Sequence, residues 1–320
     1  NVEMKLDCRI GIAAYPLDGE TAEELVRRAG IAMHDAAQLP GRLQVYQQGR
    51  DDAHQRQVNL IRDLRRAPGN GELQLHYQAK LSLSSGRVEQ AEALLRWLHP
   101  QYGMVSPGEF IPLAERTGSI QALTAWVIEE ALRQLQVWAE RGLRLQLSLN
   151  ISADDLHDLH LAARVGKLLQ QYRVPAEQLI FEVTESAVMG NPEQALTILQ
   201  QLRGLGISLS VDDFGTGYSS LSQLKRMPVQ ELKIDQSFVR DLDEASEDAV
   251  IVRSTIDMSH SLGLKVVAEG VEYERSLRLL ERWGCDTVQG YLISRPLSAE
   301  AFETWHGQPL NPLLLRETER

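Results

Sequence analysis

Two adjacent aspartates, Asp212 and Asp213, stand where the apolar segment 207–211 ends and a glycine-rich turn begins. Neighbouring carboxylates raise each other's pKa and resist joint ionisation unless a cation lies between them. A divalent metal ion would supply that cation. For an isolated pair, the commoner arrangement is that one aspartate caps the next helix while the other faces water. The choice between these interpretations depends on the rest of the sequence.

Other polar residues occupy the same kind of position, late in a short apolar segment or directly after one. They are Glu92, Asn150, Glu182, Lys233, Glu269 and Gln289. One such residue is usually solvated or caps a helix, but a set that shares the position is harder to explain in that way. Oxygen donors from Glu, Asn and Asp, without His or Cys, suit Mg²⁺ or Mn²⁺ better than zinc or copper.

Short apolar segments alternate along the chain with longer amphipathic ones. The predicted strands are 73–79, 88–95, 145–151, 179–183, 207–211, 231–234, 264–268 and 287–292, and the predicted helices are 107–116, 120–141, 153–172, 192–205, 245–262 and 274–283. About eight strand-helix repeats within roughly 250 residues predict a closed, TIM-like (β/α)₈ barrel. The short turn 84–86 predicts a hairpin, and therefore one antiparallel strand.

Residues at the helix ends support this assignment. Ser152 and Asn191 are predicted N-caps, Pro192 suits a first helical position, and a glycine follows each of four helices, at 142, 206, 263 and 284. The carboxyl ends of barrel strands converge on one mouth. We therefore expect the polar strand-end residues to meet there.

Composition narrows the classes of function. The 320 residues carry a formal net charge of −11 and are 43% hydrophobic. This acidic balance argues against binding a DNA or RNA polymer or a membrane surface, since both attract basic proteins. Cys8 and Cys285 are too few and too far apart to suggest a disulfide framework or a thiolate zinc site. With no long apolar stretch or signal peptide, we expect a cytoplasmic fragment of a longer protein, which could carry a membrane anchor elsewhere.

Eight motifs, in order along residues 55–308, give the chain a family resemblance. They are residues 92–97 (EALLRW), 110–115 (FIPLAE), 148–152 (SLNIS), 182–186 (EVTES), 212–218 (DDFGTGY), 232–235 (LKID), 268–272 (AEGVE) and 289–291 (QGY). As a set they resemble the EAL-type cyclic-di-GMP phosphodiesterases. The resemblance implies hydrolysis of cyclic di-GMP to linear pGpG by a metal-dependent, homodimeric enzyme.

The resemblance also implies site residues. Glu92, Asn150, Glu182 and Asp212 would hold a first Mg²⁺ or Mn²⁺, while Asp212 and Asp213 would hold a second. Lys233, Glu269 and Glu92 would be catalytic. The implied substrate-binding residues are Gln78, Leu94, Arg96, Pro112 and Gln289. The implied regulatory loop, which links the metal site to dimerisation, comprises Glu185, Phe214, Gly215, Thr216 and Gly217.

The N-terminal residues suggest a separate region. Residues 9–16 and the predicted helix 21–38 resemble the last strand and helix of a GGDEF, or diguanylate cyclase, domain, without its signature loop. The predicted organisation is a GGDEF-like fragment at 1–48, a linker helix within 49–71, the EAL barrel at 72–308 and a tail at 309–320.

Two other functions are compatible with a barrel of this kind. One is a catalytically silent receptor that binds cyclic di-GMP and passes on a conformational signal. Every predicted metal and lysine position is filled, which favours catalysis. The other is a lyase or aldolase that uses Lys233 as a Schiff base. It explains the lysine but not the carboxylates around it.

Overall fold

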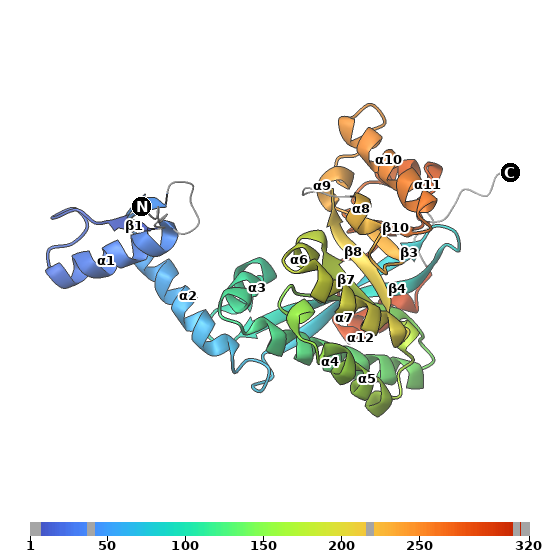
Figure 1. The fold of residues 1–320 in the computed structure, drawn as a ribbon, viewed down its shortest axis with the longest axis horizontal. Coiled ribbons are helices and arrows are strands. Elements are labelled where there is room, and N and C mark those ends of the chain that lie inside the picture. The colour runs from blue at the N-terminus through green and yellow to red at the C-terminus, as the bar shows by residue number, and fades with distance from the viewer. Residues whose placement is uncertain (1–7, 37–41, 216–220, 310–313, 315–320) are drawn as a thin grey trace, which may run out of the picture. The chain divides into compact units, whose positions relative to one another are not determined.

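The computed structural model describes residues 8–36, 42–215, 221–309 and 314. The chain divides into two compact units, Asn1–Arg66 and Ala67–Arg320, and Figure 1 labels many of their elements. The division falls inside the predicted linker. In the smaller unit, β1 (Ile10–Ile12) pairs in parallel with β2 (Leu43–Val45).

Two helices complete the smaller unit. The first, α1 (Ala22–Asp35), starts at a capping box in which Thr21 and Glu24 satisfy each other's backbone N–H groups. The second, α2 (Arg50–Leu64), packs against α1. A 2.6 Å ion pair from Arg50 to Asp35 joins them.

The larger unit is a closed eight-stranded barrel, as the sequence predicts. Its strands are β3 (Leu73–Ser82), β4 (Arg87–His99), β6 (Gln146–Ile151), β7 (Leu179–Thr184), β8 (Ser208–Phe214), β9 (Glu231–Ile234), β10 (Lys265–Ala268) and β11 (Thr287–Gln289), with β5 (Gly103–Val105) added to β4. The order around the barrel is β3, β11, β10, β9, β8, β7, β6 and β4, and β4 closes onto β3. Strand β3 is antiparallel to both neighbours, which confirms the predicted hairpin.

Helices lie around the outside of the strands (Figure 1). They are α3 (Pro107–Arg116), α4 (Ile120–Glu140), α5 (Leu161–Tyr172), α6 (Glu185–Met189), α7 (Pro192–Gly204), α8 (Leu221–Leu224), α9 (Gln236–Val239), α10 (Glu247–Ser261), α11 (Glu274–Arg282) and α12 (Ala299–His306). Short 3₁₀ turns occur at η2 (Asp155–His157) and η3 (Ala176–Gln178). Within the described ranges, no helix combines the length and apolarity needed to cross a membrane.

The side chains of β3 alternate between the helices and the barrel interior. Tyr77 points outward and packs edge-to-face on Trp138 of α4, with ring centroids 4.8 Å apart, and Trp138 stacks on Phe302 of α12. Because successive side chains of a strand face opposite sides, Gln78 and Lys80 point inward. The aromatic cluster thus fixes which residues of β3 enter the barrel.

Most predicted helix ends are confirmed, but the predicted start of one helix, 153–172, is wrong. Asn191 caps α7 by accepting a hydrogen bond from Gln194 N, and Gly206 takes a left-handed conformation after it. The predicted helix 153–172 is interrupted by η2, so Ser152 does not cap it. Instead, the buried carboxylate of Asp155 accepts hydrogen bonds from Ser152 and from Thr124 of α4. These bonds hold the segment in a turn, and α5 begins only after it.

The last predicted strand, 287–292, is shorter than expected. Strand β11 ends at Gln289 because the chain turns at Gly290, where Val271 receives and donates backbone hydrogen bonds. A Cβ atom at residue 290 would lie 2.2 Å from the carbonyl oxygen of Val271. Glycine is therefore required for this close approach of two backbone segments beside the barrel mouth.

Replacing Gly290 with alanine should destabilise the barrel by about 1–3 kcal/mol, the usual cost of overpacking. Urea unfolding would measure the loss. Gly204→Ala is the matched control, because that site lies in α7 and has no atom within 4 Å of an added Cβ. Equal unfolding free energies for the two variants would contradict the expected clash.

Candidate active site

A β-bulge brings both aspartates of the opening pair to the barrel mouth. Along β8 and β9, Val211 lies opposite Leu232 and Phe214 opposite Ile234, so β8 has one extra residue across from Lys233. The backbone of Asp213 has a φ of 54°, a left-handed conformation that residues other than glycine rarely adopt. Bulges redirect side chains that would otherwise alternate between faces. As a result, carboxylate oxygens of Asp212, Asp213 and Glu269 lie within 4.8 Å of one another.

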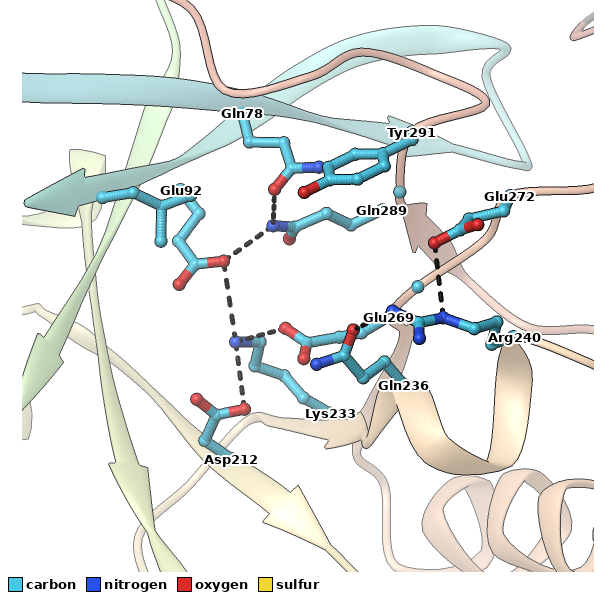
Figure 2. A pocket seen from close by; sticks show the side chains of 13 residues that line it. Gln78, Glu92, Asp212, Lys233, Gln236, Arg240, Glu269, Glu272, Gln289 and Tyr291 are labelled. Atoms are coloured by element: carbon cyan, nitrogen blue, oxygen red, sulfur yellow. Dashed lines mark hydrogen bonds and ion pairs between the residues drawn. The ribbon is translucent and has the colours of Figure 1, made fainter. Parts of the chain in front are cut away.

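Lys233 is the cation around which the carboxylates gather (Figure 2). Its side chain is 1% exposed. The ammonium nitrogen lies 2.5 Å from Glu182, 2.6 Å from Glu269, 3.0 Å from Asp212 and 3.9 Å from Glu92. The predicted meeting of distant strand ends is thus present in the structure.

Glu182 has a second lysine partner that the sequence analysis missed. Lys80 of β3 is fully buried, and its ammonium nitrogen lies 2.6 Å from Glu182 Oε1 and 2.8 Å from Ser148 Oγ. The available signal was the strand period, because Lys80 follows the predicted site residue Gln78 by two positions. Both oxygens of Glu182 are therefore bound to ammonium groups.

A chain of amide side chains holds Glu92. Asn150 donates to Glu92 Oε1 at 2.9 Å, and Gln289 donates to Oε2 at 2.7 Å. The same Gln289 nitrogen lies 3.2 Å from Gln78 Oε1 (Figure 2). The four side chains come from four different strands, so they fix the Glu92 carboxylate beside Lys233.

The acids of this site differ in pKa because their burial and their charged neighbours differ. Burial raises the pKa of Glu269 to about 8, and the pKa of Glu92 and of Asp212 rises for the same reason. Burial also opposes ionisation of Glu182, but Lys233 and Lys80 outweigh it and lower the pKa to about 2. The surrounding carboxylates overcome the desolvation of Lys233 and raise its pKa well above the ordinary value.

Two cavities adjoin this cluster. One, of about 230 Å³, is lined by Gln78, Glu92, Lys233, Glu269 and Gln289, together with Leu94, Asp212, Gln236, Arg240, Gly270, Glu272, Gly290 and Tyr291. The sequence analysis had not singled out Gln236, Arg240, Glu272 or Tyr291 as site residues. A larger cavity of about 410 Å³ shares the wall at Leu94 and is lined by Arg96 and Asn150 among mostly apolar side chains. Pro112 is exposed on α3, next to Ile111, which lines this second cavity.

The predicted regulatory residues lie beside the aspartates as far as the structure describes them. Phe214 is buried at the end of β8, and Gly215 has a φ of 99° close to the ring of Phe238. Glu185 begins α6, directly after β7. Thr216 and Gly217 lie outside the described residues.

The donor set fits divalent metal ions that prefer oxygen. Four carboxylates, from Glu92, Asp212, Asp213 and Glu269, share the mouth with the amide of Asn150, and all four have raised pKa values, chiefly because loss of water penalises their negative charge. Bound cations would remove that penalty. Hard oxygen ligands without His or Cys match Mg²⁺ or Mn²⁺. Among the predicted ligands, Glu182 is the one whose two oxygens already accept hydrogen bonds from ammonium groups, those of Lys80 and Lys233.

The Schiff-base alternative fits this geometry poorly. A lysine nucleophile must lose its proton, and enzymes achieve this by lowering the lysine pKa. Here the carboxylates around Lys233 raise the pKa and stabilise the ammonium form. The site is therefore built to keep a positive charge at this position.

The acids with raised pKa values make the folding stability of the metal-free protein depend on pH. Between an unfolded pKa near 4.5 and a folded pKa of about 8, the folded state keeps a proton on Glu269 that the unfolded chain has released. Stability from this group is complete below the lower value and is lost as pH rises through the higher one. The lowered pKa of Glu182 acts only below this window.

We therefore expect the melting temperature in EDTA to fall as pH rises across this window, and Mn²⁺ to reduce that fall. Glu269→Gln should make the profile in EDTA less steep, whereas Glu89→Gln, on the exposed side of β4, should leave its slope unchanged. Differential scanning fluorimetry at several pH values is the measurement. A wild-type melting temperature that did not change with pH in EDTA would contradict the raised pKa values of these acids.

Comparison with known proteins gives a family match. The EAL domain matches residues 61–296. The chain is 42% identical over 300 residues to the bifunctional diguanylate cyclase/cyclic di-GMP phosphodiesterase MucR of Pseudomonas aeruginosa, covering 93% of this chain and 44% of MucR. It is also 42% identical over 305 residues to the cyclic di-GMP phosphodiesterase NbdA of the same organism, covering 92% of this chain and 38% of NbdA.

Solved structures give the same result. The PaMucR phosphodiesterase in complex with c-di-GMP superimposes with a TM-score of 0.73 at 44% identity, covering 76% of this chain and 99% of that one. The FimX EAL domain from P. aeruginosa bound to c-di-GMP gives a TM-score of 0.70 at 29% identity, covering 75% and 97%. The chain spans less than half the length of MucR and of NbdA. It belongs to the EAL-domain family.

Proposed function

We propose that this chain hydrolyses one phosphodiester bond of cyclic di-GMP and releases linear pGpG. The observation that carries the proposal is the cluster of Glu92, Asp212, Asp213 and Glu269 around Lys233 in an open cavity. Relatives with 42% identity bear the name of cyclic di-GMP phosphodiesterases. Phosphodiesterases of this family are in general metal-dependent, which agrees with the oxygen donors at the mouth.

In this proposal, the mouth holds two Mg²⁺ or Mn²⁺ ions. Glu92, Asn150, Glu182 and Asp212 would hold one, and Asp212 with Asp213 would hold the other. When bound, such ions supply a water of lowered pKa and stabilise the charge on the phosphate oxygens. The short separations among the oxygens of Asp212, Asp213 and Glu269 support a second ion beside the bulge.

The remaining steps fall to the protein's own side chains. A water oxygen loses a proton and forms a bond to phosphorus, the bond from phosphorus to the 3′ oxygen breaks, and the 3′ oxygen takes up a proton. Lys233 keeps a fixed positive charge near the reacting phosphate, where negative charge accumulates. Glu269, whose carboxylate lies 2.6 Å from the ammonium nitrogen of Lys233, is placed to exchange a proton at the reacting centre. Glu92 is held in place by two amide groups.

Substrate contacts are proposed for the walls of the two cavities. Arg96 presents a guanidinium group suited to a phosphate, and Leu94 offers an apolar surface between the cavities. Gln78 and Gln289 add amide groups in the smaller cavity. Pro112, on the exposed face of α3, would contact the substrate from the rim of the larger one.

Regulation through a homodimer is a further part of the proposal. Residues 214–217, with Glu185 as an anchor, would couple dimerisation to the metal site. The support is position, because Phe214 and Gly215 directly follow Asp213 and any movement of them acts on its strained backbone. For residues 1–48 we propose a GGDEF-like fragment without cyclase activity. They lie outside the EAL match.

The proposal predicts that purified protein with Mn²⁺ or Mg²⁺ converts cyclic di-GMP to pGpG, and that EDTA stops the reaction. Glu92→Ala should abolish turnover, since it removes a metal ligand bonded to two other site residues. Glu89→Ala, at an exposed position of the same strand, is the control and should behave as wild type. Chromatography of the nucleotide products measures both. Tight nucleotide binding without turnover in either metal would instead indicate the receptor function.

Lys233→Ala should lower kcat by about 10²–10³-fold, the loss seen when one group that stabilises transition-state charge is removed. Affinity for cyclic di-GMP, measured by calorimetry in EDTA, should change far less. Lys265→Ala, at an exposed position of β10, is the matched control. A variant that lost affinity and turnover in equal measure would show that Lys233 binds the ground state instead.

A further inference from the structure

A second polar layer lies beneath the residues of the barrel mouth. Two positions deeper along each strand, side chains face the same interior. The layer includes Lys80 below Gln78, Ser148 below Asn150, Ser210 below Asp212 and Glu231 below Lys233, and each of these four is at least nine-tenths buried. Lys80 follows Gln78 because β3 runs against its neighbours, whereas the others precede their partners.

Lys80 is the member of this layer that reaches up to the mouth. Its ammonium nitrogen lies 2.6 Å from Glu182 Oε1, while the ammonium of Lys233 lies 2.5 Å from Oε2. The side chains of Lys80 and Glu182 are both 0% exposed. One oxygen of Glu182 is thus fixed from below, and the other is left facing Lys233.

A purely structural role for Lys80, as the counter-charge of Glu231, agrees less well with the contacts. Ser148 and Glu182 accept the hydrogen bonds of Lys80, whereas Glu231 Oε1 has no hydrogen-bond partner among the described residues. Lys80 therefore contacts Glu182, the predicted metal ligand with the least exposed side chain.

We propose that Lys80 is a positioning residue for the proposed phosphodiesterase. Its ammonium group holds Glu182 Oε1 from beneath, so that Oε2 stays turned toward the mouth, where Lys233 and the metal ions would meet it. The inference rests on the proposed function and adds a residue to it. Partners that orient metal ligands typically change metal affinity or activity by about 10–100-fold when they are removed.

Lys80→Met tests this role, because methionine keeps the unbranched shape and removes the charge. We expect calorimetry to show Mn²⁺ binding weakened by about 10–100-fold and kcat lowered with it. Thr287→Val is the matched control, since Thr287 is buried two positions below Gln289 in β11 and carries no charge. It should leave Mn²⁺ affinity unchanged at a similar melting temperature.

A second pair of variants separates positioning from folding. If Lys80 acts through Glu182, adding Lys80→Met to Glu182→Gln should change Mn²⁺ affinity little, while additive losses would overturn the proposal. If Lys80→Met alone does not fold, Lys80→Met with Glu231→Gln removes a buried lysine and a buried carboxylate together. That variant should fold and show the same weakened Mn²⁺ binding.

The outcomes distinguish this proposal from the proposed function. Wild-type protein that binds Mn²⁺ but does not hydrolyse cyclic di-GMP would refute the function, while the calorimetry would still decide the role of Lys80. Wild-type protein that hydrolyses the substrate, with a folded Lys80→Met variant equal to it in Mn²⁺ affinity and kcat, would refute only the positioning role. Absence of both Mn²⁺ binding and hydrolysis in the wild type would refute both.

Discussion

The structure depends on the burial of more negative charge than the protein itself neutralises. Five carboxylates, from Glu92, Glu182, Asp212, Glu231 and Glu269, share the barrel interior with the two ammonium groups of Lys80 and Lys233, and the exposed carboxylate of Asp213 lies beside them at the mouth. Taking such groups out of water is costly unless opposite charge accompanies them. The imbalance is resolved by retained protons or by bound cations, and the same residues favour both. Cation binding and protonation therefore compete at this site.

The barrel makes this concentration of charge possible. Parallel strands place their carboxyl ends at one mouth, and the hydrogen-bonded ladders hold the backbone rigidly enough to resist repulsion between side chains. Two departures from regularity complete the site. The bulge in β8 adds Asp213 to a face that Asp212 already occupies. Strand β3 runs antiparallel to its neighbours, and the side chain of Lys80 extends from the second layer to Glu182.

Strand and helix periodicity, capping residues and strand-end positions were enough to predict the barrel, its hairpin and the meeting of Glu92, Glu182, Asp212 and Lys233. Lys80 was missed because a lone lysine in a strand is usually exposed, and the strand period, which puts it on the same face as Gln78, does not reveal its buried partner Glu182. The break before α5 was missed because it depends on Thr124, which is distant in sequence. Local patterns predict elements, whereas buried polar partners are determined by the assembled fold.

Under the proposed function, this acidic chain must bind an anionic substrate, and the positive charges of its site are largely engaged. Lys80 and Lys233 are engaged by carboxylates, and Arg240 at the cavity rim lies 3.3 Å from Glu272. Arg96 retains a guanidinium group beside the larger cavity, although one of its nitrogens donates to the Leu95 carbonyl. With so little uncommitted positive charge, attraction for phosphate must come mainly from metal ions held by the carboxylates. Under the proposed function, metal and substrate therefore bind with positive coupling, each strengthening the other by the same factor.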